Sequence, residues 1–190
     1  MRDVFRPALT LFLLMSLLLG AAYPALVTAS AQGLFPRQAN GSLIRKDDKI
    51  LGSRLIGQNF SDPKYFWGRL SATPSFATNA ANSGGSNLSA ANPALTEAVQ
   101  NRVSQLKKTD PKNANPIPVD LVTSSGSGLD PDISPAAAAW QISRVAKARD
   151  ISEDEVRSLV AQHTEPRSLG FLGEERVNVL LLNLAMDGKL

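Results

Sequence analysis

The sequence contains no cysteine and only one histidine, His163. The absence of cysteine excludes disulfides, thiol nucleophiles and cysteine-ligated metal sites. A single imidazole cannot form a histidine-rich metal site, and any Ser-His-Asp triad would have to use it. No Gly-x-Ser-x-Gly nucleophile elbow occurs in the chain. We therefore expect no catalytic residue and no metal site, and we interpret His163 as a residue near a helix end in a favourable dipole contact.

A phosphate-binding loop is also missing. Gly52 and Gly57 have the glycine spacing of such a loop, but Gln58 and Asn59 occupy the positions where it needs a lysine and a hydroxyl. The chain has no Asp-Lys-Thr-Gly phosphorylation motif either. It is therefore not itself the catalytic chain of a P-type pump.

Asp130 and Asp132 resemble the start of a calcium loop, but the later ligands and the glycine at the sixth position are missing. Because Asp130 precedes Pro131, we expect it to form a turn. Basic residues are scattered: Lys and Arg total 20, against 17 Asp and Glu, and the formal net charge is +3. A nucleic-acid surface needs a denser basic stripe. We expect a mixed, solvated surface and no nucleic-acid partner.

A long uncharged run, residues 8–27, lies close to the N-terminus. As a helix it spans about 30 Å, the thickness of a hydrocarbon core. The alternative is a cleaved signal peptide, since Ala29-Ser30-Ala31 has the form of a cleavage site. The run exceeds the roughly 7–15 apolar residues of a signal peptide, which favours an anchor. We predict a transmembrane helix over residues 8–29.

The orientation of this helix is predicted from the charges beside it. Arg2 and Arg6 precede the span closely, while a long following domain often crosses the membrane whatever its charge. We therefore expect residues 1–7 to be cytoplasmic and residues 30–190 to form an extracytoplasmic α+β domain with long polar loops. The protein is then expected to cross a membrane once, with its main domain on the far side.

The first half of the soluble part predicts little regular structure. Residues 32–90 are rich in Gly, Asn, Ser and Pro, and a flexible linker is the alternative interpretation. Short strands are expected at 42–44 and 53–57, separated by the charged turn 46–49. Residues 82–87 carry a strong loop signal.

The second half predicts helices. One helix begins at Asn92-Pro93, where Asn caps and Pro is favoured at the first position, and ends before Asp110-Pro111. Residues 119–122 form a candidate strand. A second helix begins at Ser134-Pro135 by the same logic and continues to Ala148. The expected fold is one mixed domain, rich in helix in its C-terminal half.

Two further helix boundaries follow from caps. Ser152 and Glu155 form a capping-box pattern that begins a third helix. A last helix is expected over 175–186, with Gly188 as a C-cap. On the second helix, Trp140 is interpreted as a core anchor, and Gln141 as a surface polar group rather than a ligand contact.

Several short sequence strings follow one another along the chain in a characteristic order. They are Arg6-Pro7-Ala8-Leu9, Tyr23-Pro24, Gln38-Ala39-Asn40-Gly41-Ser42-Leu43-Ile44, Leu55-Ile56-Gly57-Gln58-Asn59-Phe60, Tyr65-Phe66, Ser83-Gly84-Gly85-Ser86-Asn87-Leu88, Asn92-Pro93, Asp120-Leu121-Val122-Thr123, Ser127-Gly128-Leu129-Asp130, Ile133-Ser134-Pro135 and Arg144-Val145-Ala146-Lys147-Ala148-Arg149. Together they resemble KdpC, the C subunit family of the bacterial Kdp potassium-transporting P-type ATPase. The resemblance covers nearly the full length. Leu70, where the family pattern has proline, and Asp132, where many relatives have histidine or asparagine, are departures that affect local loop contacts.

The resemblance implies a non-catalytic accessory subunit, a single-pass protein of the bacterial inner membrane. Its implied partners are a channel-like potassium-translocating subunit, the P-type ATPase subunit and a small fourth subunit, besides the lipid bilayer. It also implies a catalytic chaperone that raises the ATP affinity of the ATPase subunit through a transient ternary complex with ATP. No cofactor is then bound stably, and Gln141 is the candidate nucleotide contact. An extracytoplasmic domain conflicts with cytoplasmic ATP, so assembly support or capping of the potassium entrance is easier to reconcile.

Two sets of residues are candidate partner contacts. Small residues in the span, Gly20, Ala21 and Ala22, permit close approach of a partner helix. Polar loop residues are candidates for docking on partner loops, namely Gln58, Asn59, Gly84, Gly85, Asn87 and Asp130. The alternative function is a membrane-tethered or secreted module that binds or hydrolyses a solute and acts alone.

Overall fold

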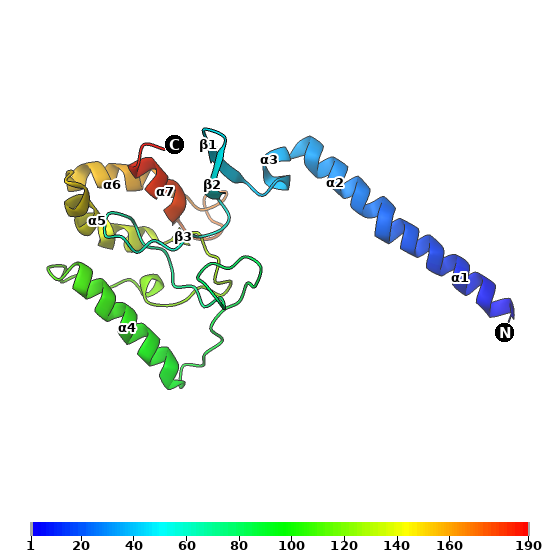
Figure 1. The fold of residues 1–190 in the computed structure, drawn as a ribbon, viewed down its shortest axis with the longest axis horizontal. Coiled ribbons are helices and arrows are strands. Elements are labelled where there is room, and N and C mark those ends of the chain that lie inside the picture. Colours follow the sequence, from blue (N-terminus) through cyan, green and yellow to red (C-terminus); the bar gives the residue numbers. More distant parts are fainter. Residues whose placement is uncertain (1, 190) are drawn as a thin grey trace. The chain divides into compact units, whose positions relative to one another are not determined.

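The computed structural model describes residues 2–189, in two units that divide between Leu43 and Ile44. Residues 1 and 190, the ends of the predicted segments 1–7 and 30–190, lie outside the described part. The first unit is a helix with three segments, α1 (Arg2–Leu17), a π-helical turn (Leu18–Ala22) and α2 (Tyr23–Leu34), followed by the short α3 (Pro36–Ala39) (Figure 1).

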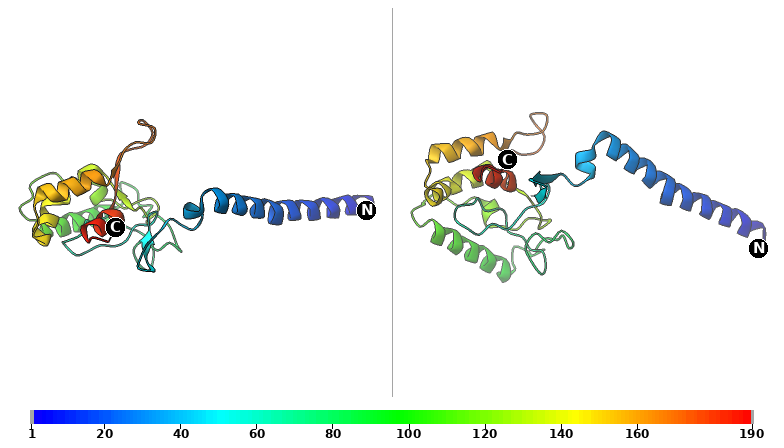
Figure 2. Two further views of the ribbon diagram at one scale, coloured as in Figure 1. Left: turned by 90° about the horizontal axis from the view of Figure 1, so that it is seen from above. Right: turned by 45° about the horizontal axis from the view of Figure 1, so that its top comes forward.

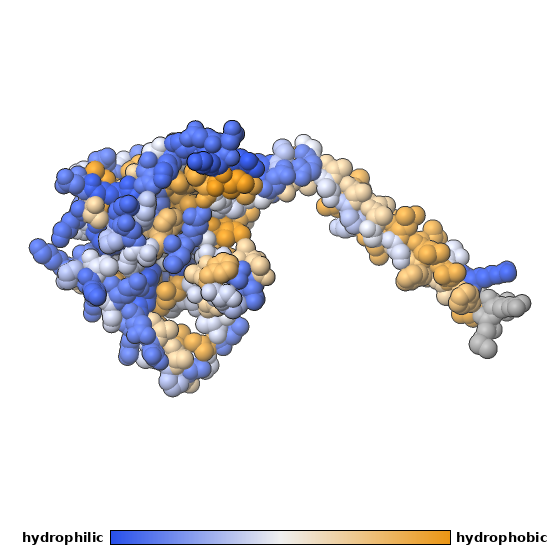
Figure 3. Space-filling view, in the orientation of Figure 1, coloured by the Kyte–Doolittle hydropathy of each residue, from blue (hydrophilic) through white to orange (hydrophobic). Residues whose placement is uncertain are grey.

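The long helix has the length and composition of a membrane span. Its apolar stretch, Val4–Leu34, has 31 residues and a mean hydropathy of 2.0. None of the most apolar window is buried inside the structure, and Figure 3 shows apolar residues covering much of this helix. About 20 such residues suffice to cross a hydrocarbon core. The predicted span, residues 8–29, lies inside this helix.

A π-helical turn, Leu18–Ala22, interrupts the helix and contains the small residues Gly20, Ala21 and Ala22. The backbone N–H of Tyr23 donates to the Leu18 carbonyl, five residues earlier. Pro24, which follows, has no N–H to offer to the Gly20 carbonyl, and the change of register accommodates this missing donor.

Two short strands begin the second unit. β1 (Leu43–Lys46) pairs with β2 (Lys49–Ser53) in a two-stranded sheet. Asp47 and Asp48 join them, both with positive φ, as in the tight turns of hairpins. A strand near 42–44 followed by a charged turn was expected, but the prediction of the second strand over 53–57 is wrong. The two-residue turn brings the second strand forward to Lys49.

The helices of the second unit begin where their caps predict. The side chain of Asn92 caps α4 (Pro93–Thr109), and that of Ser134 caps α5 (Pro135–Arg149). The side chain of Ser152 accepts from the Glu155 N–H at the start of α6 (Glu153–Gln162). His163 follows α6 directly, as expected for a residue near a helix end.

Two predictions near the sheet are wrong. Residues 119–122 form no strand, because Val119–Leu121 closes a 3₁₀ turn in which the Leu121 N–H donates to the Pro118 carbonyl. The last helix, α7 (Val179–Met186), begins four residues later than expected, because Arg176–Asn178 is a strand, β5. Gly188 follows α7 with φ +62°, as the C-cap prediction requires.

β5 is the central strand of a small antiparallel sheet. Its neighbours are β3 (Asp132–Ile133) and β4 (Thr164–Glu165), in the order β3-β5-β4. Ile133 and Thr164 both lie opposite Val177, one from each neighbouring strand. Because β3 lies far from β5 in sequence, no local pattern predicts their pairing.

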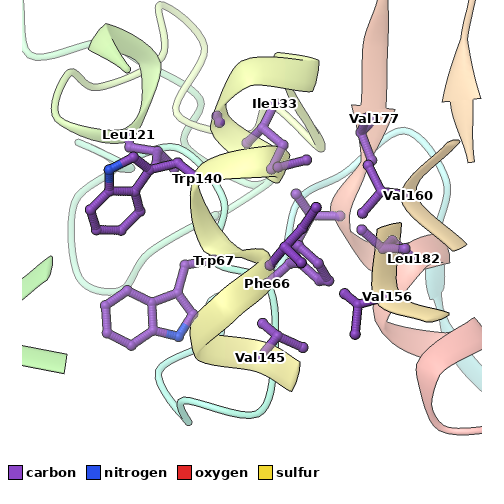
Figure 4. Packing of buried hydrophobic residues seen from close by; sticks show 14 of the residues in the cluster. Phe66, Trp67, Leu121, Ile133, Trp140, Val145, Val156, Val160, Val177 and Leu182 are labelled. Carbon is purple, nitrogen blue, oxygen red and sulfur yellow. The ribbon is translucent and has the colours of Figure 1, made fainter. Parts of the chain in front are cut away.

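The main hydrophobic core lies between α5, α6, α7 and an irregular segment around residues 60–70 (Figure 4). Phe66 and Trp67 from that segment are at most 1% exposed, and Trp140 of α5 is buried as predicted. The interpretation of residues 32–90 as a flexible linker is therefore wrong, since part of this stretch is core. The fold is α+β with its helices concentrated in the C-terminal half, as expected.

Candidate functional site

A side-chain amide holds the most buried part of the irregular segment. Gln141 on α5 is fully buried. Its Oε1 accepts from the Trp67 backbone N–H at 2.8 Å, and its Nε2 donates to the Trp67 carbonyl at 3.0 Å. The interpretation of Gln141 as a surface polar group is therefore wrong. Its amide makes the two backbone hydrogen bonds of Trp67 that a neighbouring strand would otherwise make.

Asn183 on α7 makes the same pair of hydrogen bonds with Phe66, the residue before Trp67. Its Oδ1 accepts from the Phe66 N–H at 2.8 Å, and its Nδ2 donates to the Phe66 carbonyl at 2.9 Å. Two buried amides from two helices thus satisfy four backbone groups of two consecutive aromatic residues. Leaving those groups buried and unpaired costs free energy, so both amides are structural requirements of the core.

Two guanidinium groups lie over the indole ring of Trp67. The Cζ of Arg144 is 4.6 Å, and that of Arg102 5.1 Å, from the centre of one ring. Arg144 donates to the carbonyls of Pro63 and Tyr65, at 2.5 and 3.1 Å, while its Nε has no hydrogen-bond partner among the described residues. Burial lowers the pKa of Arg144 to about 10 and also lowers the pKa of Arg102. These two cations stabilise the fold through carbonyls and an aromatic face.

A third arginine completes the attachment of this segment. Arg149 donates to the Lys64 carbonyl at 2.7 Å and forms an ion pair with Asp187 at 2.8 Å. Tyr65 donates its hydroxyl to the same carboxylate at 2.9 Å. Burial acts to raise the pKa of Asp187, but hydrogen bonds from Arg149, Lys189 and Tyr65 outweigh burial and lower it.

Three polar loops, around Gly57, around Gly84-Gly85 and at residues 126–130, contact one another through their backbones and form a loop cluster. The Gly57 N–H donates to the Leu129 carbonyl at 2.8 Å, and a Cβ at Gly57 would lie 2.5 Å from the Asp130 carbonyl oxygen. The Gly84 N–H donates to the Ser127 carbonyl at 2.9 Å. A Cβ at Gly85 would lie 2.9 Å from the Gly126 carbonyl oxygen. Close backbone approach therefore explains the glycines at positions 57 and 85.

Asp130 ties the loop cluster to the sheet. Its Oδ1 accepts from the Asp132 N–H at 3.0 Å, which confirms the predicted turn. Its Oδ2 pairs with Arg69 at 3.0 Å. Burial raises the pKa of the neighbouring Asp132. Asp130 and Asp132 line a surface pocket. Residues of β3, of β5 and of the neighbouring loops also line it, among them Arg69, Val119, Asp120, Glu174 and Arg176.

Of the six polar loop residues predicted to dock on partner loops, the structure brings only some together in the loop cluster. Gly84, Gly85 and Asp130 belong to the loop cluster. Gln58 and Asn59 are exposed, and Gln58 donates to the Leu51 carbonyl of β2 at 2.9 Å. Asn87 is exposed, with φ +51°. In the other unit, Gly20, Ala21 and Ala22 lie on the π-helical turn and are exposed.

No cluster of three or more His, Cys, Asp or Glu side chains suited to a metal ion occurs within residues 2–189. The buried polar side chains Gln141, Asn183 and Arg144 bond to backbone groups of the chain itself. They hold the irregular segment against α5 and α7, while Gln58, Asn59 and Asn87 stay exposed.

Sequence reasoning missed the structural polar residues. Asn183 interrupts the apolar stripe of α7, and a polar residue within such a stripe is a signal of a buried hydrogen bond. Arg102 lies one turn before the buried Leu106 on α4, which is a similar signal. Gln141 follows Trp140 directly and gave no such signal, because its partner lies 74 residues away.

The chain matches a family model over residues 5–188, that of KdpC, described as the c chain of the K⁺-transporting ATPase. A "Potassium-transporting ATPase KdpC subunit" of Sorangium cellulosum is 61% identical over 183 residues, covering 96% of both chains. The subunit of the same name from Methylococcus capsulatus has the same identity and coverage. That of Herpetosiphon aurantiacus is 60% identical over 187 residues, covering 98% of this chain and 97% of its own. The chain therefore belongs to the KdpC family.

Proposed function

We propose that the chain is a non-catalytic accessory subunit of an ATP-driven potassium uptake complex. The observation that carries this proposal is the full-length match to subunits named for the potassium-transporting ATPase. The fold is consistent with it, because its buried polar groups are engaged in holding the domain together. The alternative of a solute-binding or hydrolytic module that acts alone has no support from these relatives.

The proposed partners are a channel-like potassium-translocating subunit, the P-type ATPase subunit and a small fourth subunit. In the bilayer, the span contacts a partner helix through Gly20, Ala21 and Ala22, since small residues permit close packing. The π-helical turn places these residues where the helix register changes. In the domain, the loop cluster and its exposed neighbours Gln58, Asn59 and Asn87 contact partner loops.

The proposed orientation has residues 1–7 in the cytoplasm and the domain after the span outside the inner membrane. Protease added to spheroplasts tests this orientation. We expect the domain to be digested while the short N-terminal segment stays protected. A fully protected domain contradicts the orientation.

The proposed mechanism is preferential binding of one state of the pump. A subunit changes a conformational equilibrium only through a difference in its affinity for the two states. A rise in the ATP affinity of the ATPase subunit, through a transient ternary complex with ATP, is a proposal of this kind. The burial of Gln141 argues against its direct contact with nucleotide, so the effect on ATP affinity is assigned to the protein contacts.

Replacing the span tests the subunit role. We would exchange residues 8–29 for an unrelated apolar helix of equal length and express the full chain with the other subunits. We expect the exchanged chain to reach the membrane but to lose most of the co-purifying partners in mild detergent. A variant with only Gly20→Leu and Ala21→Leu should show part of this loss. Unchanged assembly with the foreign span contradicts the proposed packing.

A further inference from the structure

The loop between β4 and β5 carries an exposed apolar tip. Seven large apolar side chains are exposed in the described domain from Ile44 onward. Three of the seven lie in this loop, within a stretch of four residues. Leu169 is 83% exposed, Phe171 68% and Leu172 49%. Figure 2 shows residues 166–175 extending away from the helices of the domain in both views. Their exposure means that they contribute little to the core.

The tip is closed into a defined hairpin. Ser168 and Leu172 exchange two backbone hydrogen bonds, each of 2.9 Å, and pair as an antiparallel bridge. Below the bridge, Arg167 and Glu174 form an ion pair at 2.5 Å. The apolar side chains are therefore held on an ordered turn.

An ion-pair network supports the base of the hairpin. Glu165 of β4 pairs with Arg54 and, at 2.8 Å, with Arg176 of β5. Arg176 also pairs with Asp132 of β3 at 3.2 Å. Each strand of the small sheet thus contributes a charge to the network at the base of the hairpin.

The backbone conformation at Leu169, in the tip of the hairpin, is unfavourable for a leucine. Leu169 has φ +54°, in the left-handed region that a bulky side chain rarely adopts. Gly170, the next residue, has φ +83° without such strain. A glycine or asparagine at position 169 would relieve the strain, and an exposed leucine returns no core packing in exchange. A strained backbone position that carries an exposed leucine points to a contact outside the chain.

The charges around the tip indicate what kind of surface it meets. Residues 165–176 carry three carboxylates and two guanidinium groups, a net charge of −1. They contain no lysine, tryptophan or tyrosine, the residues that together with arginine mark membrane interfaces. Arg167 and Arg176 are both engaged in ion pairs. This composition fits an apolar recess of a protein with a basic rim better than a lipid surface.

We propose that the hairpin tip, residues 168–172, inserts into an apolar recess of another protein subunit of the complex, with Glu175 facing a basic group on the rim. The inference rests on the proposed subunit function and names a contact surface for it. Apolar and aromatic anchors that enter a pocket carry most of the energy of such interfaces.

A triple variant tests this contact in the full chain, expressed with the other subunits. Leu169→Ser, Phe171→Ser and Leu172→Ser together should lower the recovery of partners in mild detergent at least about tenfold. Phe76→Ser is the matched control, since Phe76 is 63% exposed elsewhere in the domain, and it should recover partners like the unmodified chain. Glu175→Lys should lower recovery by a smaller factor, about threefold.

The outcomes separate the inference from the subunit function. If the triple variant recovers its partners normally, the hairpin contact is refuted and the subunit function stands. If the unmodified chain recovers none, both fail. An unchanged thermal unfolding midpoint of the triple variant shows that its loss of partners is not a loss of folding.

Photo-crosslinking identifies the occupant directly. Phe171 is replaced by p-benzoylphenylalanine in the full chain, and intact cells are irradiated. We expect one adduct with a larger membrane subunit, and the same replacement at Phe76 should not form it. Adducts only with lipid, only with a second copy of the chain, or none at all overturn the inference.

Discussion

The side-chain amide of Gln141 pairs with both backbone groups of Trp67, as a neighbouring strand would. Asn183 does the same for Phe66. Through these two residues, a segment without regular secondary structure contributes its aromatic side chains to the core. The segment is thereby attached to α5 and α7, which supports the proposed docking of the loops that continue from it.

Gln141→Leu should strongly destabilise the domain. The leucine fills similar space but leaves the Trp67 N–H and carbonyl buried without partners. We expect the free energy of unfolding to fall by about 2–5 kcal/mol, since each unpaired buried group costs roughly 1–3 kcal/mol. Urea unfolding of the full chain in mild detergent, followed by tryptophan fluorescence, measures this change.

Gln100→Leu is the control for this substitution. Gln100 is an exposed residue of α4, so the same chemical change should alter the free energy of unfolding by less than about 0.5 kcal/mol. Equal effects of the two substitutions would contradict the structural role of Gln141.

Arg144→Lys tests whether the geometry of the guanidinium matters beyond its charge. Arg144 reaches Pro63, Tyr65 and Gln141 with two nitrogens while lying over an aromatic ring. An ammonium group cannot reproduce this planar set of donors. We expect a loss of about 2–4 kcal/mol in the free energy of unfolding.

The exposed Arg157 on α6 provides the comparison for Arg144. Arg157→Lys keeps its surface ion pairs and should change the free energy of unfolding by less than about 0.5 kcal/mol. A stable Arg144→Lys variant with unchanged tryptophan emission would show that the contacts with Trp67 are dispensable.

Gly57→Ala should disturb the loop cluster, because the new Cβ would lie 2.5 Å from the Asp130 carbonyl oxygen. Backbone must move to relieve this contact, at an expected cost of about 1–3 kcal/mol. At Gly84 a Cβ meets nothing within 4 Å, so Gly84→Ala should be tolerated. Thermal unfolding of the two variants, side by side, measures the difference. Equal midpoints would argue against the close approach of these loops.

Asp187 gives the domain a defined acid sensitivity. Hydrogen bonds outweigh burial and lower its pKa in the folded state, below about 3.9 in the unfolded chain. The carboxylate therefore stabilises the fold above about pH 4, and this contribution disappears as the pH falls through the folded-state pKa. Urea midpoints at pH 7 and pH 3 should differ less for Asp187→Asn than for the unmodified chain. An identical pH response would contradict the role of this carboxylate.

Local signals predicted the helices well. Asn92, Ser134 and Ser152 each cap a helix with their own side chains, and those contacts span only two or three residues. The late start of α7 was missed because β5 pairs with strands from elsewhere in the chain. A pairing of this kind overrides the helical pattern of its own residues.

The candidate site was predicted less completely than the helices. Glycines that permit close approach of two loops, such as Gly57 and Gly85, were recognised as loop residues, but the loops they meet were not. The burial of Gln141 and Arg102 depends on carbonyls in distant segments, those of Trp67 and Gly68. Sequence spacing carries no information about such partners.

Purification of the full-length chain from membranes in mild detergent tests the central claim most directly. Mass spectrometry of the recovered material should identify larger membrane subunits of a potassium-transporting ATPase, in a constant ratio to this chain. The mass of the chain itself should include its N-terminal helix. Recovery of a form trimmed near residue 31, in the soluble fraction and without partners, would contradict the account.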